Sequence, residues 1–476
     1  MGKQKVKRIK WMFKCTIFAL LFLFSGSTGR IVDAQVEDET APIYIVNTGD
    51  TLWGISRTFN IPLEELAQRN GISDPSQLIV GTRLVIPGYE GLQGTVVIEE
   101  VPFGENLNSL SRSYKIPKED LIRLNRWTTP DNTAAGSTLI ALEREEEQAL
   151  GIGARTTLRM NESVFEMAIS KDTNRWTVYH ENDLSGIRDM LPGEIYFLPG
   201  DDENGPGGIP EVVESVVFDT KNLVQGKTIK LMVIAEENLI LEGKIVDYEL
   251  NFFPHQEGFV ALQGIHAMLE PGYYPATLSG SLMDGTRFDF AQQVYIQDGG
   301  YPFDPPLVVN SETIDVENTT PEDLEWLSMV EPVGETRLWS GIFKAPVPDP
   351  LSECFPSLFG SRRSYNGSAY EYFHTGLDFC GRAGVEIYAP AAGRVVFADS
   401  LIVRGNATVI DHGWGVYTAY AHQSEILVEV GDRVERGQLI GLVGSTGRVT
   451  GPHLHWEVIV GSIQVDPLEW LRAEFP

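Results

Sequence analysis

Three kinds of hydrophobic pattern follow one another along the 476 residues of the chain. Near the N-terminal end, apolar positions such as Leu52, Ile55 and Phe59 recur at helical spacing between short alternating stretches. Between residues 208 and 298 apolar and polar residues alternate in short runs, which predicts strands. Beyond residue 341 similar runs are divided by glycines and again predict strands. A domain commonly holds about 100–200 residues, so we expect several domains.

An internal repeat organises the N-terminal part of the chain. Residues 43–88 predict the order strand, helix, helix, strand, and the same pattern returns at a shift of 55 positions without a gap. A shift of 112 positions gives a fainter third copy. We therefore expect three units, at residues 42–89, 97–144 and 150–200. The identities between the first two copies are Gly49/Gly104, Leu52/Leu107, Ser56/Ser111, Ile61/Ile116, Pro62/Pro117, Leu66/Leu121, Asn70/Asn125, Pro75/Pro130, Gly81/Gly136 and Leu84/Leu139.

Most of the remaining chain predicts β structure. Residues 208–298 alternate over four strand candidates and carry the hairpin signal Asp284-Gly285, which is typical of a β-sandwich. Residues 299–340 are rich in Pro, Glu and Thr with little periodicity and predict an extended linker. The glycine-divided strands of residues 341–476 predict a mainly antiparallel sheet folded into an open barrel or groove. The strand candidates of the sandwich are Thr228–Val233, Phe259–Ile265, Ala276–Ser281 and Arg287–Ile296.

Residues 1–34 have the layout of a secretory signal peptide. Basic side chains dominate its beginning, an apolar stretch runs from Cys15 to Phe24, and cleavage after Ala34 fits the pattern. The apolar run is shorter than the roughly 20 residues that a membrane span needs. An uncleaved anchor beginning at Trp11 is the alternative. We expect a secreted or cell-envelope protein that meets a membrane only through this segment.

Acidic residues determine the electrostatic character of the chain. It contains 66 Asp and Glu against 37 Lys and Arg, which gives a formal net charge of −29. So acidic a protein repels polyphosphates, and this argues against nucleic acid as a partner. Affinity for any anionic polymer would have to come from specific contacts.

The candidate chemistry lies in the last quarter of the chain, which holds five of the eight histidines. His374 and Asp378 are four residues apart, and a fully extended chain would place them about 13 Å from each other. A shared metal ion therefore requires a bend, which costs least at Gly376. His453 and His455 alternate in an apolar run and share one strand face. Two His and one carboxylate suit a catalytic zinc ion that keeps its fourth position for water.

Two cysteines, Cys354 and Cys380, follow the signal segment. In an exported protein such a pair forms either a disulfide or two buried free thiols. Cys380 lies two residues after Asp378 and shares its strand face, which indicates a structural or site-shaping role.

The motifs His374-x-x-x-Asp378, Tyr420-Ala-His422 and His453-Leu-His455 resemble those of the lysostaphin-type peptidoglycan metallo-endopeptidases. The resemblance covers about residues 340–476. It implies that His374, Asp378 and His455 bind one Zn²⁺ ion per chain, and that His422 and His453 are catalytic. No position of the motifs is missing.

Two more side chains lie near these motifs. His412, in the turn His412-Gly-Trp-Gly415, is interpreted as structural or as lining the rim of the site, not as a ligand. Tyr420 shares the strand face of His422 and either lines the cleft or belongs to the core.

The N-terminal repeats resemble LysM domains, closely in the first copy, moderately in the second and weakly in the third. LysM domains bind N-acetylglucosamine chains, including the glycan of peptidoglycan. The resemblance implies that the loop Gly49, Asp50 and Thr51, together with Ile79 on the facing loop, lines the sugar groove. The second copy has Glu105-Asn106 in place of Asp50-Thr51.

The sequence as a whole predicts an exported zinc endopeptidase that cuts stem or crossbridge peptides of peptidoglycan and is targeted to the glycan by LysM domains. Two alternatives remain at this point. One is a non-catalytic, wall-bound activator of another hydrolase, and the other is a glycan-binding structural protein. The bond that is cut, the wall that is attacked and the roles of His422 and His453 relative to each other do not follow from the sequence.

Overall fold

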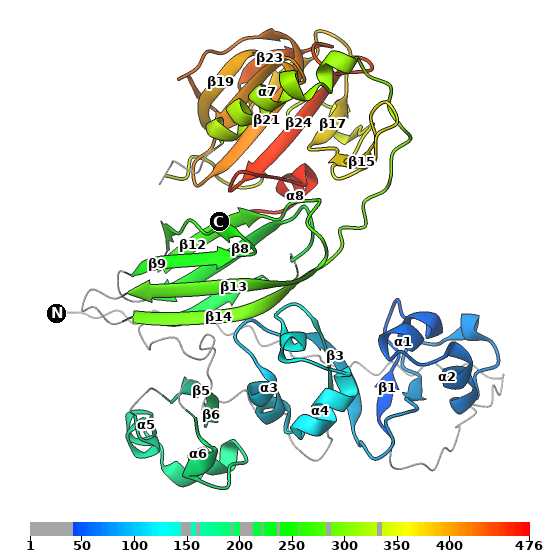
Figure 1. Cartoon of the computed structure of the whole chain (residues 1–476), viewed down its shortest axis with the longest axis vertical. Coiled ribbons are helices and arrows are strands. Elements are labelled where there is room, and N and C mark those ends of the chain that lie inside the picture. The colour runs from blue at the N-terminus through cyan, green and yellow to red at the C-terminus, as the bar shows by residue number, and fades with distance from the viewer. Residues whose placement is uncertain are drawn as a thin grey trace, which may run out of the picture.

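The computed structural model describes residues 41–143, 154–158, 162–191, 194–199, 213–219, 221, 223–235, 239–256, 258–281, 287–330 and 336–476. The expected signal peptide and the expected turn Asp284-Gly285 lie outside these ranges. Figure 1 shows the β-sandwich between the N-terminal repeats and the C-terminal domain. Within the described ranges, every helix is too short or too polar to cross a membrane.

The repeats have the expected strand–helix–helix–strand order. Strands of the first two copies join one sheet in the order β2-β1-β3-β4, in which β1 and β3 are parallel. The third copy pairs its own strands, β5 with β6. The elements are β1 (Ile43–Ile45), α1 (Leu52–Thr58), α2 (Leu63–Arg69), β2 (Arg83–Val85); β3 (Thr95–Glu100), α3 (Leu107–Tyr114), α4 (Lys118–Asn125), β4 (Thr138–Glu143); β5 (Ala154–Thr157), α5 (Val164–Ser170), α6 (Arg175–Glu181) and β6 (Ile195–Leu198).

An asparagine fastens the second helix to the last strand in all three copies. The Asn70 side chain donates to the carbonyls of Leu66 and Val85, both at 2.9 Å, and accepts from Val85 N at 2.7 Å. Asn125 and Asn182 make the same three hydrogen bonds at the positions shifted by 55 and 112 residues. Each bond satisfies backbone groups at a helix end or strand that would otherwise lack partners. The third copy therefore shares the construction of the first two.

Two four-stranded antiparallel sheets form the expected β-sandwich. Their orders are β10-β9-β13-β14 and β11-β12-β8-β7. Val233 and Leu231 from one sheet pack with Leu278 and Phe288 from the other in a common core. The strands are β7 (Val213–Phe218), β8 (Thr228–Ala235), β9 (Ile240–Ile245), β10 (Tyr248–Glu249), β11 (Phe253–His255), β12 (Gly258–Gly264), β13 (Gly272–Ser281) and β14 (Arg287–Ile296).

The C-terminal domain is built on a nine-stranded antiparallel sheet, as its glycine-divided strands predict. The main path runs β17-β24-β21-β20-β19-β22, with β23 joining β18 to β21 and β25 pairing with β24. Its elements are β15 (Arg362–Arg363), β16 (Tyr372–Phe373), β17 (Leu377–Cys380), β18 (Glu386–Tyr388), β19 (Gly393–Leu401), β20 (Gly405–Asp411), β21 (Val416–Ile426), β22 (Arg433–Val434), β23 (Leu439–Val443), β24 (His453–Val460), β25 (Ile463–Val465) and α8 (Pro467–Arg472).

The segment expected as an extended linker contains the helix α7 (Val316–Met329), which lies over the C-terminal sheet (Figure 1). The side chain of Trp326 is 2% exposed and packs with Phe397 and Val409 of that sheet. The prediction of an extended segment is therefore wrong here. Pro321 lies inside the helix and argued against it, but burial of Trp326 outweighs the cost of the proline.

Candidate metal centre

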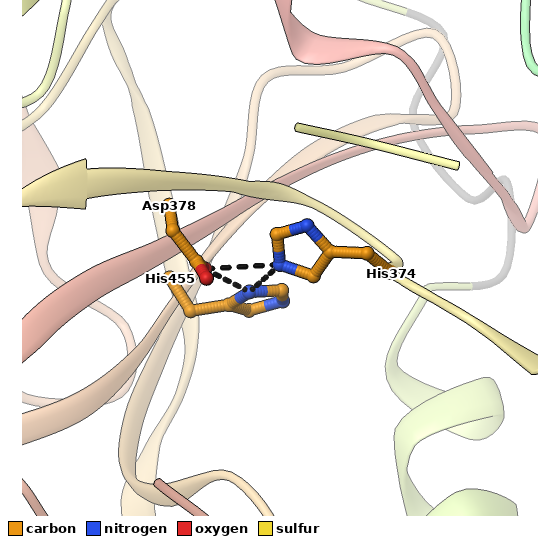
Figure 2. Close-up of side chains that lie close together, drawn as sticks. All are labelled: His374, Asp378 and His455. Carbon is orange, nitrogen blue, oxygen red and sulfur yellow. Dashed lines mark hydrogen bonds and ion pairs between the residues drawn. The ribbon is translucent and has the colours of Figure 1, made fainter. Parts of the chain in front are cut away.

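Strands β17 and β24 bring the predicted metal ligands together. In their antiparallel ladder Asp378 is paired with His455, and Cys380 is paired with His453. His374 follows β16 directly and reaches the same point from the other side (Figure 2). Gly376 allows this approach, because a Cβ there would lie 2.4 Å from the carbonyl oxygen of Trp456. Only glycine fits between the two strands at this place.

Three atoms converge in Figure 2. His374 Nε2 is 2.9 Å from Asp378 Oδ1 and 3.0 Å from His455 Nδ1, and His455 Nδ1 is 2.9 Å from Asp378 Oδ1. All three residues are at least nine-tenths buried. The sequence therefore identified a set of side chains that the fold places within hydrogen-bond distance of one another.

The outer partners of the two histidines show which ring nitrogen carries the proton. His374 Nδ1 lies 2.8 Å from the carbonyl oxygen of Leu358, and His455 Nε2 lies 3.0 Å from Glu457 Oε1. A carbonyl and a carboxylate can only accept, so these nitrogens are the donors. In neutral rings the lone pairs of His374 Nε2 and His455 Nδ1 then point at each other and at Asp378. Three acceptors so close repel unless a positive charge lies between them.

A zinc ion fits this donor set. Ligand atoms at about 2.0–2.2 Å in tetrahedral geometry are about 3.3–3.6 Å apart, a few tenths of an ångström more than the distances found here. Two imidazole nitrogens and one carboxylate oxygen are ligands that zinc accepts in catalytic sites. The carboxylate of Glu457 on the far side of His455 orients the ring, as carboxylates commonly do for metal-binding histidines.

The surroundings of the three side chains favour positive charge. Burial alone would raise the pKa of Asp378, but the charge of His374 and hydrogen bonds from His374 and His455 outweigh it and hold that pKa well below its usual range. Burial alone would lower the pKa of His455, but its hydrogen bonds to Asp378 and Glu457 raise it to about 9. Burial lowers the pKa of His374. The negative charge of Asp378 and Glu457 stabilises a proton on His455. The same charge would stabilise a metal cation at this place.

His422 and His453 lie beside this group. Their ring centroids are 5.1 Å apart, and the ring of His422 is 5.9 Å from that of His455. His422 Nδ1 is 2.8 Å from the carbonyl of Thr446, and His453 Nδ1 is 2.8 Å from that of Gly451. Each Nδ1 is therefore the donor, and Nε2 of each neutral ring keeps its lone pair. Burial lowers the pKa of His422 to about 3, with a smaller contribution from His455.

A β-bulge directs His422 into the site. On β21 two residues, Ala421 and His422, stand opposite one residue of β20, and His422 has φ of +64°. A bulge of this kind breaks the alternation and redirects side chains. Tyr420, expected on the face of His422, is fully buried in the domain core. The cleft-lining interpretation of Tyr420 is thus wrong, and the core interpretation is confirmed.

A groove of about 1290 Å³ runs past these side chains. Its walls come from the C-terminal domain, the segment before α7, residues Val316, Thr319 and Asp323 of α7 itself, and residues His266 and Met268 of the β-sandwich. The C-terminal contribution includes Asp378, His422, His453 and His455. Such a groove can hold an extended peptide against the metal centre.

His412 is structural and fully buried, away from the groove. Its Nδ1 donates to the carbonyl of Ala392 at 2.8 Å, and its Nε2 is 2.8 Å from the hydroxyl of Thr418. Burial lowers its pKa to about 4. Of the two roles expected, the structural one is confirmed.

Cys354 and Cys380 form a disulfide with a Cα–Cα distance of 5.4 Å. Since Cys380 pairs with His453 in the β17–β24 ladder, the disulfide fastens the segment before His374 to the edge of the metal centre. Of the two states expected for the cysteines, the structure shows the disulfide.

The residues expected to contact glycan lie on two adjoining loops of the first repeat. Gly81 N donates to the carbonyl of Val46 at 2.8 Å and holds these loops together. Asp50 and Thr51 also have structural roles, because Asp50 accepts from Asn47 N and Thr51 caps α1. Ile79 is 71% exposed. The neighbouring Trp53, which sequence reasoning did not select, is 62% exposed and adds a large aromatic face.

The corresponding surface of the second repeat is covered by the β-sandwich. Ala134, at the position of Ile79, is fully buried, and Ala135 exchanges backbone hydrogen bonds with β14. Gln292 Nε2 donates to the carbonyl of Glu105 at 2.9 Å. In the second copy this surface is part of the interface with the β-sandwich. In the first copy the corresponding residue Ile79 is exposed.

Sequence reasoning missed side chains that touch the predicted ligands, among them two charged ones, Glu457 and Arg363. Glu457 Oε1 accepts from His455 Nε2 and, at 2.6 Å, from the hydroxyl of Thr375. Arg363 Nη2 is 4.0 Å from Asp378 Oδ2. Strand alternation could have found Glu457, because it follows His455 by two positions. Arg363 lies in the separate β15–β16 hairpin. Its distance along the sequence from Asp378 gives no indication that the two side chains meet.

Comparison with known families agrees with this geometry. Residues 372–467 match peptidase family M23, and residues 44–87 and 100–141 match the LysM domain. The chain thus has an M23, lysostaphin-type, peptidase domain at its C-terminal end, preceded by two LysM domains.

Relatives share the C-terminal part of the chain. The peptidoglycan DD-endopeptidase ShyA of Vibrio cholerae is 46% identical over 120 residues, which are 25% of this chain and 27% of ShyA. The DD-carboxypeptidase/endopeptidase Mpg of Neisseria meningitidis is 43% identical over 95 residues, 20% of this chain and 22% of Mpg. The match therefore spans about a quarter of the length of each relative.

Solved structures of similar proteins include a zinc-containing peptidase from Vibrio cholerae, with a TM-score of 0.28, 16% identity and coverage of 91% of this chain and 99% of that one. The catalytic domain of lysostaphin from Staphylococcus simulans has a TM-score of 0.21, 28% identity and coverage of 31% and 97%.

Proposed function

We propose that this protein is a zinc-dependent endopeptidase of the cell envelope that hydrolyses stem or crossbridge peptides of peptidoglycan. The observation that carries the proposal is the convergence of three buried acceptor atoms, on His374, Asp378 and His455, next to the rings of His422 and His453, whose Nδ1 atoms donate to backbone carbonyls. The name of ShyA, a peptidoglycan DD-endopeptidase, supports the choice of substrate.

His374 Nε2, Asp378 Oδ1 and His455 Nδ1 would hold the ion. When bound, zinc supplies a Lewis acid that polarises the scissile carbonyl and lowers the pKa of a water molecule toward 7. Glu457 accepts a hydrogen bond from Nε2–H of His455 and so would keep the Nδ1 lone pair directed at the ion.

His422 and His453 divide the proton transfers between them. One Nε2 accepts a proton from the attacking water, and the other stabilises the oxyanion or delivers a proton to the leaving amine. The low pKa of His422 fits a ring that is neutral, and therefore able to accept, at neutral pH. The buried setting excludes bulk water and strengthens these interactions.

The LysM domains would hold the enzyme on wall glycan. The exposed faces of Trp53 and Ile79 on the first repeat are suited to contact neutral sugar rings. Because the chain carries a net charge of −29, attachment by general electrostatic attraction to anionic wall polymers is disfavoured.

Digestion of defined peptidoglycans tests the proposal. The purified chain should release new amino termini, which mass spectrometry identifies, and a chelator should stop the release until zinc is restored. Zinc-loaded protein that binds the wall but releases no new termini from any peptidoglycan would instead support a non-catalytic role.

A further inference from the structure

Helix α7 is joined to the M23 domain by a buried carboxylate. Glu322 is 4% exposed and points into the turn between β19 and β20. Its Oε2 accepts from Val403 N at 2.7 Å, and its Oε1 accepts from Arg404 N at 3.2 Å and from Arg404 Nη1 at 2.8 Å. One side chain thus satisfies two backbone amides and a guanidinium. A buried carboxylate with three such donors fixes the position of the turn.

A cation–π contact and the burial of Trp326 support the attachment of α7 to the same turn. The guanidinium of Arg404 lies 4.2 Å from the ring centre of Trp326, one helical turn after Glu322. Trp326 itself is buried among residues of the sheet. The helix is therefore anchored to the Val403–Arg404 turn by both a charge and a ring.

The Val403–Arg404 turn also fixes the backbone of His422. The carbonyl of Arg404 accepts from His422 N at 2.8 Å, at the bulge where His422 has φ of +64°. This left-handed conformation is disfavoured for a residue with a Cβ and persists only when the surroundings enforce it. The carbonyl of Val403 accepts from Arg448 N at 2.8 Å, in the loop whose Thr446 carbonyl holds the ring of His422.

We propose that Glu322 is a positioning residue for His422, and that α7 belongs to the catalytic unit although it lies before the M23 match. Glu322 fixes the amides of the turn, and the carbonyls of the turn fix the backbone of His422 and the loop that holds its ring. The inference rests on the proposed function, since His422 acts on the water or the oxyanion. Neither Glu322 nor its helix contacts the three metal ligands in any described hydrogen bond.

The test compares Glu322→Ala and Glu322→Gln in the full zinc-loaded chain, with Glu325→Gln as the matched control. Glu325 belongs to the same helix, and its side chain is exposed and lies outside the lining of the groove. Glu322→Ala should lower kcat at least about tenfold at unchanged KM and zinc content, because small misplacements of reacting groups cost up to about 10²-fold. Glu322→Gln, which keeps an acceptor oxygen, should recover part of the loss. Glu325→Gln should match the unchanged chain.

A second readout does not depend on turnover. In protein labelled at the histidine rings, the NMR signal absent from a His422→Gln variant identifies His422. That signal should shift in Glu322→Ala and stay in place in Glu325→Gln. The inference is overturned if Glu322→Ala keeps its kcat, or if the His422 signal does not move. A parent chain that releases no peptide would contradict the proposed function, and the NMR comparison would still decide the role of Glu322.

Discussion

Asp378 and His455 are direct partners across the β17–β24 ladder, and their side chains meet with Oδ1 and Nδ1 2.9 Å apart. A strand pair thus sets the distance between two proposed ligands by its register alone. A slip of one residue would turn either side chain to the opposite face of the sheet. The candidate metal centre is therefore built on the ladder between β17, which ends the main path of the sheet, and its neighbour β24.

Glu457 should control the affinity for zinc. Glu457→Met removes the acceptor for His455 Nε2 and for the Thr375 hydroxyl, so the ring loses its fixed orientation. Loss of such a partner typically weakens metal binding about 10–100-fold. Glu457→Gln can still accept from His455 and should lose much less. Competition with a zinc-binding dye measures both affinities, and equal affinity of Glu457→Met and the unchanged chain would contradict the assigned role.

Ile79 should contribute to attachment to peptidoglycan. In a chain made inactive by His422→Ala, the further change Ile79→Asp should weaken binding to insoluble peptidoglycan about tenfold, because burying an isoleucine stabilises by about 1.5–3 kcal/mol. Ile240→Asp is the matched control, since Ile240 is 65% exposed but lies on the β-sandwich. Binding should depend weakly on salt, as expected for contacts with neutral sugar. Equal losses for the two variants would argue against a glycan site at Ile79.

The predictable part of the site is the part that follows regular geometry. Strand alternation placed His453 and His455 on one face, and the structure confirms that they lie in one strand, β24. The bulge at Ala421 and His422 could not be predicted, because nothing in the local sequence distinguishes it from a regular strand. That single extra residue explains the wrong interpretation of Tyr420.

The fold was predictable where the chain repeats or alternates. The βααβ order and the β-sandwich follow from periodicity, which reflects burial of one face of each element. Helix α7 was missed because its stability comes from docking Trp326 and Glu322 on the distant sheet, and propensity carries no information about such contacts.

His412 should make the stability of the M23 domain depend on pH. Its pKa is about 4 in the folded chain and about 6.5 when unfolded. The unfolded state therefore takes up a proton between these values while the folded state does not, and stability falls as pH drops from 6.5 toward 4. The loss amounts to about 2 kcal/mol at pH 5.

Calorimetry of the metal-free chain and of His412→Asn between pH 7 and pH 5 measures this effect. Other groups titrate equally in both proteins, so the difference in slope belongs to His412. The variant should be less stable at pH 7 but lose less on acidification. Parallel slopes would show that His412 does not account for the dependence.

The disulfide between Cys354 and Cys380 should stabilise the M23 domain. Closing a loop over a sequence separation of 26 residues restricts the unfolded chain and contributes about 3 kcal/mol in the chain-entropy model. Titration of the unfolded, unreduced protein should detect neither Cys354 nor Cys380 as a free thiol. Reduction should lower the transition temperature of the parent and leave a Cys354→Ser, Cys380→Ser variant unchanged. Two free thiols in the unreduced parent would contradict the disulfide.

The separation of metal binding from catalysis among the histidines tests the central claim most directly. Zinc content and peptide release are measured together for His455→Ala and His453→Ala in the full chain, with His374→Ala, Asp378→Ala and His422→Ala completing the set. We predict that changing His455, His374 or Asp378 removes zinc and activity together. Changing His453 or His422 should leave near-stoichiometric zinc while release falls by about 10²–10⁴-fold, the usual contribution of acid–base catalysis. Zinc lost with His453 but kept with His455, or full zinc in a parent chain that releases no peptide, would contradict the account.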